Sequence, residues 1–283
     1  MRRLGGGIAQ ASDALTIDDA TGRRHRLVLQ RWIRPGWESD DPGFDPGKEA
    51  AVLAALRGGP VPVPRVVAVD PDGAASGAPA LLTERLPGRQ PSPAQIVRPA
   101  TLEILGRTLA RIHEIGRSSV GARLRDVVPA YWAFGDLTPA RIPATTRRPD
   151  LWRTALEVAA DAPSIPAPAT LLHRDYHAWN TLWVGDRLTG VVDWTSASWG
   201  PPAADLAHLR VDLVVDISVD SAVIARAAYA GAGGNLANAR HHQMRTVFDY
   251  LGDTDLSAIP GSVERLDRFL EVVLGEPDGP TDP

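Results

Sequence analysis

The stretch LLHRDYHAWNTLWVGDRLTGVVDWTSASWGPPAADLAHL, residues 171–209, places His, Asp, Asn and a second Asp between hydrophobic runs. Two explanations compete for this pattern. The polar residues could form a metal and phosphate site on a hairpin, or they could be ordinary surface turns between buried strands. Asp and Asn are common in turns for their own hydrogen-bonding reasons, so the choice depends on their spacing and on the rest of the chain.

The segment TLWVGDRLTGVVDW predicts two strands joined by a turn at Gly185–Asp186. Asn180 directly precedes the first strand and Asp193 follows the second, so the fold-back places both residues at one end of the hairpin. An amide oxygen and a carboxylate are hard ligands that suit Mg²⁺ held together with substrate phosphates. The hairpin therefore predicts a magnesium site made by Asn180 and Asp193.

The residues just before the hairpin supply a candidate base. The order H-R-D-x-x-x-x-N, followed by an Asp at a strand end, is the arrangement used in kinase phosphoryl transfer. Asp175 is placed to accept a proton from an incoming hydroxyl, and His173 and Arg174 are the other catalytic candidates in this loop. A packed, hydrogen-bonded structural role is the preferred interpretation of His173, and Arg174 is explained equally well as a neighbour of the loop.

Composition limits the classes of function. The chain has 283 residues, a net charge of −4 and no cysteine, which argues against a general nucleic-acid binder and excludes disulfides and thiolate zinc sites. The start MRRLGGGIAQ lacks the apolar core of a signal peptide, and no run is long enough to span a membrane. We therefore expect a cytoplasmic protein with no membrane or nucleic-acid partner, either monomeric or homodimeric.

The distribution of patterns predicts an α+β chain with two lobes. Residues 1–87 show short apolar runs between turn residues, with a helix from about Lys48 to Leu56, and predict a small antiparallel β-rich lobe that ends in a hinge. Residues 88–283 carry helical patterns, such as Leu102, Leu105, Leu109 and Ile112 at helical spacing, and predict a larger, mainly helical lobe.

These motifs together resemble the aminoglycoside phosphotransferase family of small-molecule kinases, relatives of choline kinase and the protein kinases. The stretch VVDWTSASWGPPAADLA is similar to the second signature of that family, with DWT where protein kinases have DFG. The resemblance implies a two-lobed protein-kinase-like fold, with Asp175 as the catalytic base and Asn180 and Asp193 as Mg²⁺ ligands. It also implies that Asp205 is a structural anchor under the catalytic loop.

The resemblance extends to the nucleotide. It implies that LLTERLPG is the hinge, where main-chain groups near Glu84 to Leu86 contact adenine or guanine, and that Glu49 pairs with a strand cation. Gly6, Gly7 and Ser12 belong to the glycine-rich segment that is expected to cover the phosphates.

One departure concerns that strand cation. The family places Lys or Arg directly after VL in the third strand, whereas this chain has Gln30 there and Arg31 next to it. Strand alternation sends the two side chains to opposite faces. We favour Arg31 as the phosphate contact, reached through a local irregularity, and a cleft-facing Gln30 would reverse that assignment. Lys48, the only lysine, lies on the helix beside Glu49 and is a poor substitute.

The expected function is transfer of the γ-phosphoryl group of ATP or GTP to a hydroxyl of a small molecule, such as an antibiotic or another natural product, with Mg²⁺ as cofactor. Asp212, Asp216 and Asp249, with Trp132 and Tyr250, are candidate walls of the acceptor pocket. Two alternatives stay open: a metal-dependent hydrolase that uses His173, Asp175 and His177 as ligands, and a catalytically silent binding protein with a kinase fold.

Overall fold

The computed structural model describes residues 2–4, 10–33, 45–117, 120–133, 137, 142–163, 167–253 and 256–277. The chain forms two compact units that alternate along the sequence. Unit 1 consists of Met1–Gln90, Val120–Pro129 and Asn180–Ala197, and unit 2 consists of Pro91–Ser119, Ala130–Trp179 and Ser198–Pro283. The boundary at residue 87 that the sequence suggests between two lobes stays a prediction.

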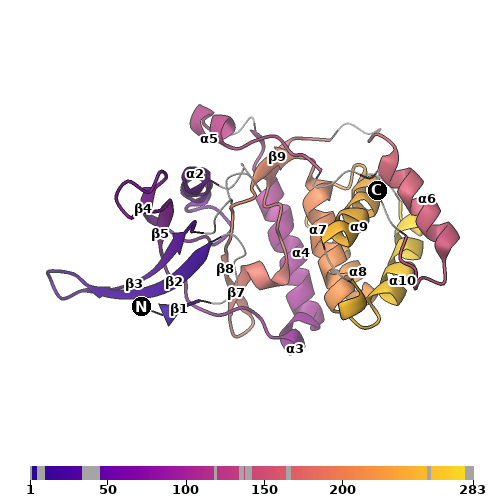
Figure 1. Cartoon of the computed structure of the whole chain (residues 1–283), viewed down its shortest axis with the longest axis horizontal. Coiled ribbons are helices and arrows are strands. Elements are labelled where there is room, and N and C mark those ends of the chain that lie inside the picture. Colours follow the sequence, from indigo (N-terminus) through magenta and orange to yellow (C-terminus); the bar gives the residue numbers. More distant parts are fainter. Residues whose placement is uncertain are drawn as a thin grey trace. The chain divides into compact units, whose positions relative to one another are not determined.

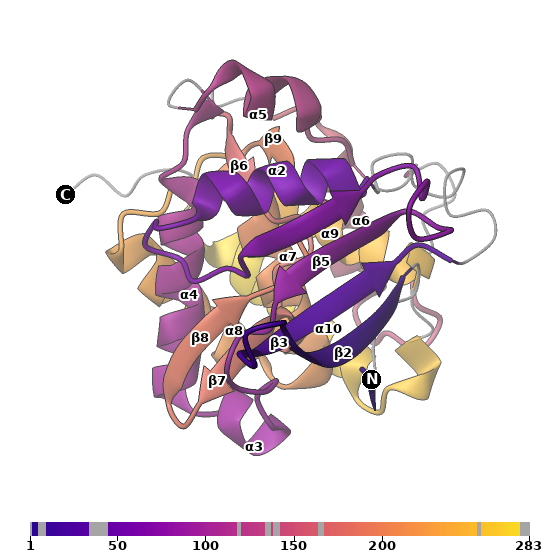
Figure 2. The same cartoon turned by 90° about the vertical axis from the view of Figure 1, so that its left-hand side faces the viewer.

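Unit 1 contains an antiparallel sheet with the strand order β1-β2-β3-β5-β4 (Figures 1 and 2). Its strands are β1 (Arg2–Arg3), β2 (Ala11–Asp18), β3 (Arg24–Arg31), β4 (Val66–Asp70) and β5 (Ala80–Glu84). β2 and β3 pair along their whole length, with Ala11 opposite Arg31 and Asp18 opposite Arg24. The turn between them contains Gly22 at φ 81°, a conformation that glycine adopts without steric cost.

Helix α2 (Pro46–Leu56) packs against β4 and β5 of this sheet (Figure 2). Its start is fixed by Asp45, whose carboxylate accepts a hydrogen bond of 2.7 Å from the Gly47 N–H. Lys48 and Glu49 lie in the first turns of α2 and are each only 2% exposed. Burial of two ionisable side chains is costly unless their surroundings compensate it, which marks this part of α2 as a functional candidate.

Unit 1 also contains α5 (Ala122–Val127) and the predicted hairpin, β7 (Thr181–Val184) and β8 (Arg187–Val191). Thr181 pairs with Val191, and the chain turns at Gly185–Asp186, where Gly185 has φ 58°. The main-chain N–H of Val192 donates to the carbonyl of Asn180 at 2.9 Å. The hairpin prediction is confirmed, and its open end carries Asn180 and Asp193.

Unit 2 is mainly helical (Figure 1). Its helices are α3 (Pro93–Ile96), α4 (Pro99–His113), α6 (Pro149–Ala160), α7 (Pro202–Asp216), α8 (Val219–Gly231), α9 (Ala239–Asp253) and α10 (Ser262–Gly275). α4 and α8 approach closely at Gly106, where a Cβ atom would lie 2.3 Å from the carbonyl oxygen of Ala225. A short ribbon of β6 (Thr170–Leu172) and β9 (Ser198–Gly200) joins the loop that begins at His173 to these helices.

The α+β class with an antiparallel β-rich part and a helical part is confirmed. Leu102, Leu105, Leu109 and Ile112 are fully buried along α4, as their spacing predicts. In the described part of the chain, no helix combines the length and the apolar character that crossing a bilayer requires.

Candidate active site

The loop that follows β6 is held in place by a buried carboxylate on α7. Asp205 accepts hydrogen bonds from the main-chain N–H groups of His173 at 2.6 Å and Arg174 at 2.8 Å. Nε2 of His113 lies 3.3 Å from the same carboxylate, and Nδ1 of His113 lies 2.8 Å from the Tyr229 hydroxyl. Arg174 has φ 73°, a conformation that costs energy for a residue other than glycine. The Asp205 carboxylate thus stabilises a strained turn immediately before Asp175.

Of the three catalytic candidates, His173 and Arg174 are engaged in contacts that support the fold of the loop. His173 is fully buried, and its Nδ1 accepts a hydrogen bond from the Asp175 N–H at 3.3 Å. The Arg174 guanidinium stacks on the rings of Tyr131 and Trp132, at 4.5 and 5.0 Å from their centroids. Burial lowers the pKa of this guanidinium. The side chain of Asp175, in contrast, is 40% exposed and accessible to an acceptor.

Two imidazoles contact the Asp175 carboxylate. Nε2 of His177 lies 3.4 Å from Oδ1, and Nε2 of His208, on α7, lies 3.2 Å from the same oxygen. Burial by itself would raise the pKa of Asp175, but the hydrogen bonds from the two imidazoles hold that pKa well below its usual range. Asp175 is therefore an anion throughout the neutral pH range.

Unit 1 contains a cavity of about 390 Å³, within the usual range for small-molecule sites. Its walls come from β1 to β3, α2, the segment after β5 and the hairpin. The predicted site residues that line it are Ser12, Glu49, Glu84, Leu86, Asn180 and Asp193. Gly6 and Gly7 lie outside the described residues. The structure thus brings six predicted residues from distant parts of the sequence to one cavity.

Gln30, and not Arg31, lines this cavity. Nε2 of Gln30 donates to Oε1 of Gln10 at 3.1 Å, and Nε2 of Gln10 donates to Oδ1 of Asp193 at 3.4 Å. Arg31 instead pairs with Asp13 on β2 at 3.0 Å. Because β3 remains regular at both positions, alternation sends their side chains to opposite faces. The local irregularity that the Arg31 assignment requires is absent from this paired stretch of β3.

The charge balance in the cavity is unfavourable for two carboxylates. Burial, followed by the negative charge of Asp193, raises the pKa of Glu49 to about 8. The Glu49 carboxyl accepts a hydrogen bond of 3.2 Å from the Trp194 N–H. Asp193 has φ 66° and accepts a hydrogen bond of 2.8 Å from the Thr195 hydroxyl. A cation bound by Asp193 and the Asn180 amide would relieve this repulsion, so the donor set fits a hard divalent ion.

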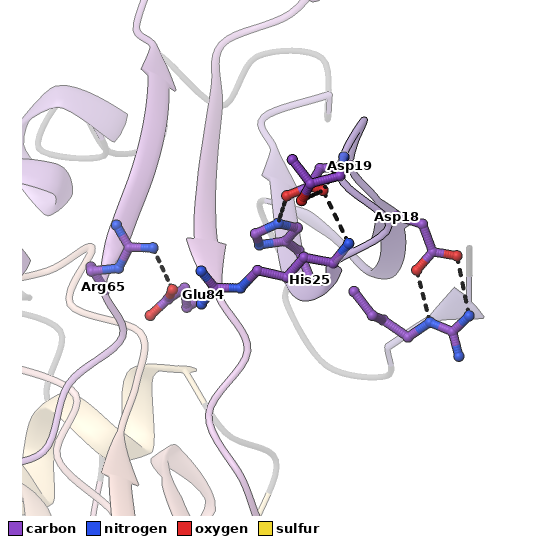
Figure 3. Close-up of polar contacts among 8 residues, drawn as sticks. Asp18, Asp19, His25, Arg65 and Glu84 are labelled. Carbon is purple, nitrogen blue, oxygen red and sulfur yellow. Dashed lines mark hydrogen bonds and ion pairs between the residues drawn. The ribbon is translucent and has the colours of Figure 1, made fainter.

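The segment after β5 shows how the expected hinge is built. The Glu84 carboxylate pairs with Arg65, which lowers the pKa of Glu84 (Figure 3). The main-chain N–H of Glu84 donates to the Arg65 carbonyl at 2.8 Å, and that of Arg85 donates to the Arg26 carbonyl at 2.9 Å. These two N–H groups are therefore engaged within the sheet. A nucleobase contact near Glu84 to Leu86 would have to use other main-chain atoms.

Unit 2 contains a separate cavity of about 440 Å³. Prolines, alanines and Tyr131 form much of its wall, with the α9 residues His241, His242 and Arg245. Ala169 lines it just before β6, and Gly200 lines it at the end of β9. The cavity therefore lies at the end of the ribbon where Thr170 pairs with Gly200. The loop that carries Asp175 follows Leu172, at the opposite end of the ribbon, so the cavity is separate from Asp175.

Comparison with known families identifies the chain at the level of a family. The model of the phosphotransferase enzyme family matches residues 7–243, well over half of the sequence. The chain belongs to this family. No curated protein matches the phosphotransferase.

Solved structures of related fold cover nearly the whole phosphotransferase. The macrolide 2'-phosphotransferase MphH from Brachybacterium faecium is 21% identical, with 98% of this chain and 92% of that chain covered and a TM-score of 0.60. A thermostable mutant of the aminoglycoside phosphotransferase APH(4)-Ia is 18% identical, with 97% and 94% covered and a TM-score of 0.60. The amicoumacin kinase hAmiN, in complex with AMP-PNP, Ca²⁺ and Ami, is 15% identical, with 99% and 90% covered and a TM-score of 0.58. At these identities the likeness shows the fold, and it confirms the kinase-like prediction.

Two residues that contact predicted site residues, one in each unit, were not anticipated from the sequence. His208 reaches Asp175 from α7, and Gln10 connects Gln30 with Asp193. His208 follows Asp205 by three residues, about one helical turn, so it lies on the same face of α7 as the expected anchor. That spacing would have allowed His208 to be predicted from the sequence, whereas no sequence pattern around Gln10 predicts its contacts.

Proposed function

We propose that the phosphotransferase moves the γ-phosphoryl group of ATP or GTP to a hydroxyl group of a small molecule. The observation that carries this proposal is the convergence of Asn180, Asp193 and Glu49 on one cavity of unit 1 together with Gln30 and the segment after β5. A cavity with this lining suits a nucleotide whose phosphates approach the hairpin and whose base approaches residues 84–86.

The proposed chemistry assigns separate tasks to the two groups of residues. Asn180 and Asp193 would hold Mg²⁺, which supplies charge neutralisation for the phosphates when it is bound. Asp175 would orient the acceptor hydroxyl and accept its proton as the new bond to phosphorus forms. A carboxylate with a low pKa is a weak base, which suits a loose transition state in which the proton leaves late and positioning contributes most.

The alternatives receive less support. A metal-dependent hydrolase would need His173, Asp175 and His177 as ligands, yet His173 is buried and its Nδ1 accepts the Asp175 N–H. Across the residues that the structure describes, no group of three or more His, Asp or Glu side chains is arranged to hold a metal ion. A silent binding protein would not require Asp175 to be held in its ionised form by two imidazoles.

The acceptor class is the least constrained part of the proposal. MphH is named as a macrolide 2'-phosphotransferase, and APH(4)-Ia has been solved in a ternary complex with AMP-PNP and hygromycin B. These names motivate a screen of ATP and GTP turnover with aminoglycosides, macrolides, nucleoside antibiotics and amino alcohols.

The test of the mechanism compares two variants in the same screen. Asp175→Asn should reduce turnover by about 10²–10⁴-fold and leave nucleotide affinity unchanged, because the amide cannot accept the proton. Asp193→Ala should abolish the Mg²⁺ dependence of nucleotide binding, measured by isothermal titration with and without the metal. Turnover within a few-fold of wild type in Asp175→Asn would remove the base from the mechanism, and unchanged Mg²⁺ dependence in Asp193→Ala would remove the metal assignment.

A further inference from the structure

The Asp175 carboxylate is contacted by imidazoles from two separate parts of unit 2. His177 lies two residues after Asp175 in the loop, and His208 lies on α7, 33 residues after Asp175. Both Nε2 atoms approach the same oxygen, Oδ1, at 3.4 and 3.2 Å. The two rings lie 6.1 Å apart between centroids, at an interplanar angle of 34°. A carboxylate held by two donors on one oxygen has a fixed plane, which one local contact would not provide.

Helix α7 explains why His208 can do this. Asp205, His208, Asp212 and Asp216 are spaced by three, four and four residues, which places them along one face of the helix. Asp205 holds the main chain of the catalytic loop through two N–H groups. One turn later, His208 contacts the Asp175 side chain. The same helix therefore fixes both the backbone and the carboxylate of the loop.

We propose that His177 and His208 are positioning residues that hold Oδ1 of Asp175 and direct Oδ2 toward the acceptor hydroxyl. The proposal rests on the proposed function. In the transfer step, the acceptor oxygen forms a bond to the γ-phosphorus, and its proton passes to Oδ2. The bond from that phosphorus to the β,γ-bridging oxygen breaks, and its electron pair leaves with the nucleoside diphosphate.

The surroundings explain why the loop needs two donors. Asp175 and Asp212 interact with both imidazoles, and Asp216 on α7 and Tyr250 on α9 lie within electrostatic range of Asp212. Burial is the largest cause that raises the pKa of Asp212 to about 6; His177 and His208 lower this pKa, and the charges of Asp216 and Asp175 raise it. Burial also acts on Asp175, where it favours the protonated form. The imidazole hydrogen bonds counteract that effect of burial and keep the base in the form that can accept a proton.

A purely structural role for the two histidines is the competing explanation. Ion pairs near the surface contribute little to stability, and the His177 and His208 side chains are 18% and 21% exposed. A structural pair would change the unfolding free energy when it is removed, but it would leave kcat and its pH profile unchanged. The two explanations therefore differ in turnover, whereas both expect the contact to influence the titration of Asp175.

The contact itself is tested by the titration of Asp175 in ¹³C NMR of carboxyl-labelled aspartates, with Asp175→Asn used to assign the resonance. His177→Leu/His208→Leu should raise the titration midpoint by about one pH unit or more relative to wild type. His177→Gln/His208→Gln retains N–H donors and should keep the midpoint near that of wild type. His241→Leu, on α9, is the control for loss of a histidine elsewhere in unit 2. Equal midpoints in wild type and the double Leu variant would overturn the proposal.

Turnover of Mg²⁺·ATP with water as acceptor gives a second readout that needs no identified substrate. The double Leu variant should lose about tenfold in kcat at neutral pH, without a change in KM for ATP, and should show a new acid limb in its pH profile. The Gln variants should retain most of kcat and lack that limb. Equal losses of kcat in the Gln and Leu variants would also overturn the proposal. If Asp175→Asn keeps full turnover, the proposed function fails, while the NMR titration still decides whether the imidazoles control Asp175. Single Leu variants serve where the double variant does not fold.

Discussion

Replacing Gln30 with lysine tests the proposal that the cavity of unit 1 binds the phosphates of a nucleotide. Gln30 lines the cavity of unit 1, where its amide donates to Gln10 at 3.1 Å and lies near Glu49 and Asp193. The pKa of Glu49 is about 8, so at neutral pH this carboxyl is mostly protonated. A lysine ammonium at position 30 would favour the ionised form of Glu49 and pair with it, and could also reach the phosphates.

The magnitude follows from the difference between a neutral and a charged donor. A neutral amide hydrogen bond contributes about 1 kcal/mol net, whereas a hydrogen bond to or from a charged group contributes about 1.5–3 kcal/mol. Gln30→Lys should therefore tighten nucleotide binding by about 1 kcal/mol, or about fivefold in Kd. Isothermal titration with Mg²⁺·ATP measures this. Gln30→Met is the matched control, because it keeps the length and removes the donor.

Two outcomes would refute this reasoning. A folded Gln30→Lys variant whose Kd stays within about twofold of wild type would show that position 30 does not reach the phosphates. Weaker binding in Arg31→Ala than in Gln30→Met would show that Arg31 leaves Asp13 and contacts the nucleotide. In that case the family role of the strand cation would return to Arg31, as the sequence favours.

Three further predictions concern stability and are measured by urea unfolding. Gly106→Ala should destabilise the fold by about 2–3 kcal/mol, because the added Cβ would lie 2.3 Å from a carbonyl oxygen of α8. The control Gly252→Ala, whose Cβ would have nothing within 4 Å, should be neutral or stabilise the fold by up to about 1 kcal/mol. Equal effects of the two substitutions would contradict the close approach of α4 and α8. Burial lowers the pKa of His242 from 6.5 to about 4. The neutral His242 ring therefore contributes fully to the free energy of unfolding above about pH 6.5. That contribution, about 3 kcal/mol in total, is lost progressively as the pH falls from about 6.5 to about 4. His242→Leu should lose this part of the pH dependence, and an unchanged slope would show that the ring is protonated in the folded chain. Asp205→Asn should destabilise by about 2–4 kcal/mol, because one donor facing the carboxylate would meet an amide NH₂; stability within about 0.5 kcal/mol of wild type would contradict the anchor.

The sequence predicted features that depend on local pattern. The hairpin was predictable because its two apolar runs flank a Gly-Asp turn, and α4 was predictable because its buried leucines recur at helical spacing. The pattern formed by Asp175 and Asn180 was also recognisable, because the two residues lie only five positions apart in the sequence. In each case the neighbours that determine the structure are close in sequence.

Long-range contacts were not predictable in the same way. The sequence indicates that Gln30 and Arg31 point to opposite faces, but it does not say which face carries the cavity. Which face carries the cavity depends on the neighbouring strand β2, where Asp13 pairs with Arg31 on the face opposite to the cavity. The contact between Gln10 and Asp193 joins residues 183 positions apart, and nothing in a local pattern specifies such a pair.

The alternation of the two units along the chain has a consequence for biosynthesis. Unit 1 needs Asn180–Ala197 in addition to the first 90 residues, so it cannot be complete when the ribosome has made only its N-terminal strands. The hairpin of unit 1 is made only after much of unit 2 has been synthesised. A truncated chain that ends at residue 90 would lack Asn180 and Asp193 together with the walls they provide. The cavity proposed for the nucleotide is therefore completed late in translation, and a nascent chain shorter than about 200 residues should be unable to retain ATP.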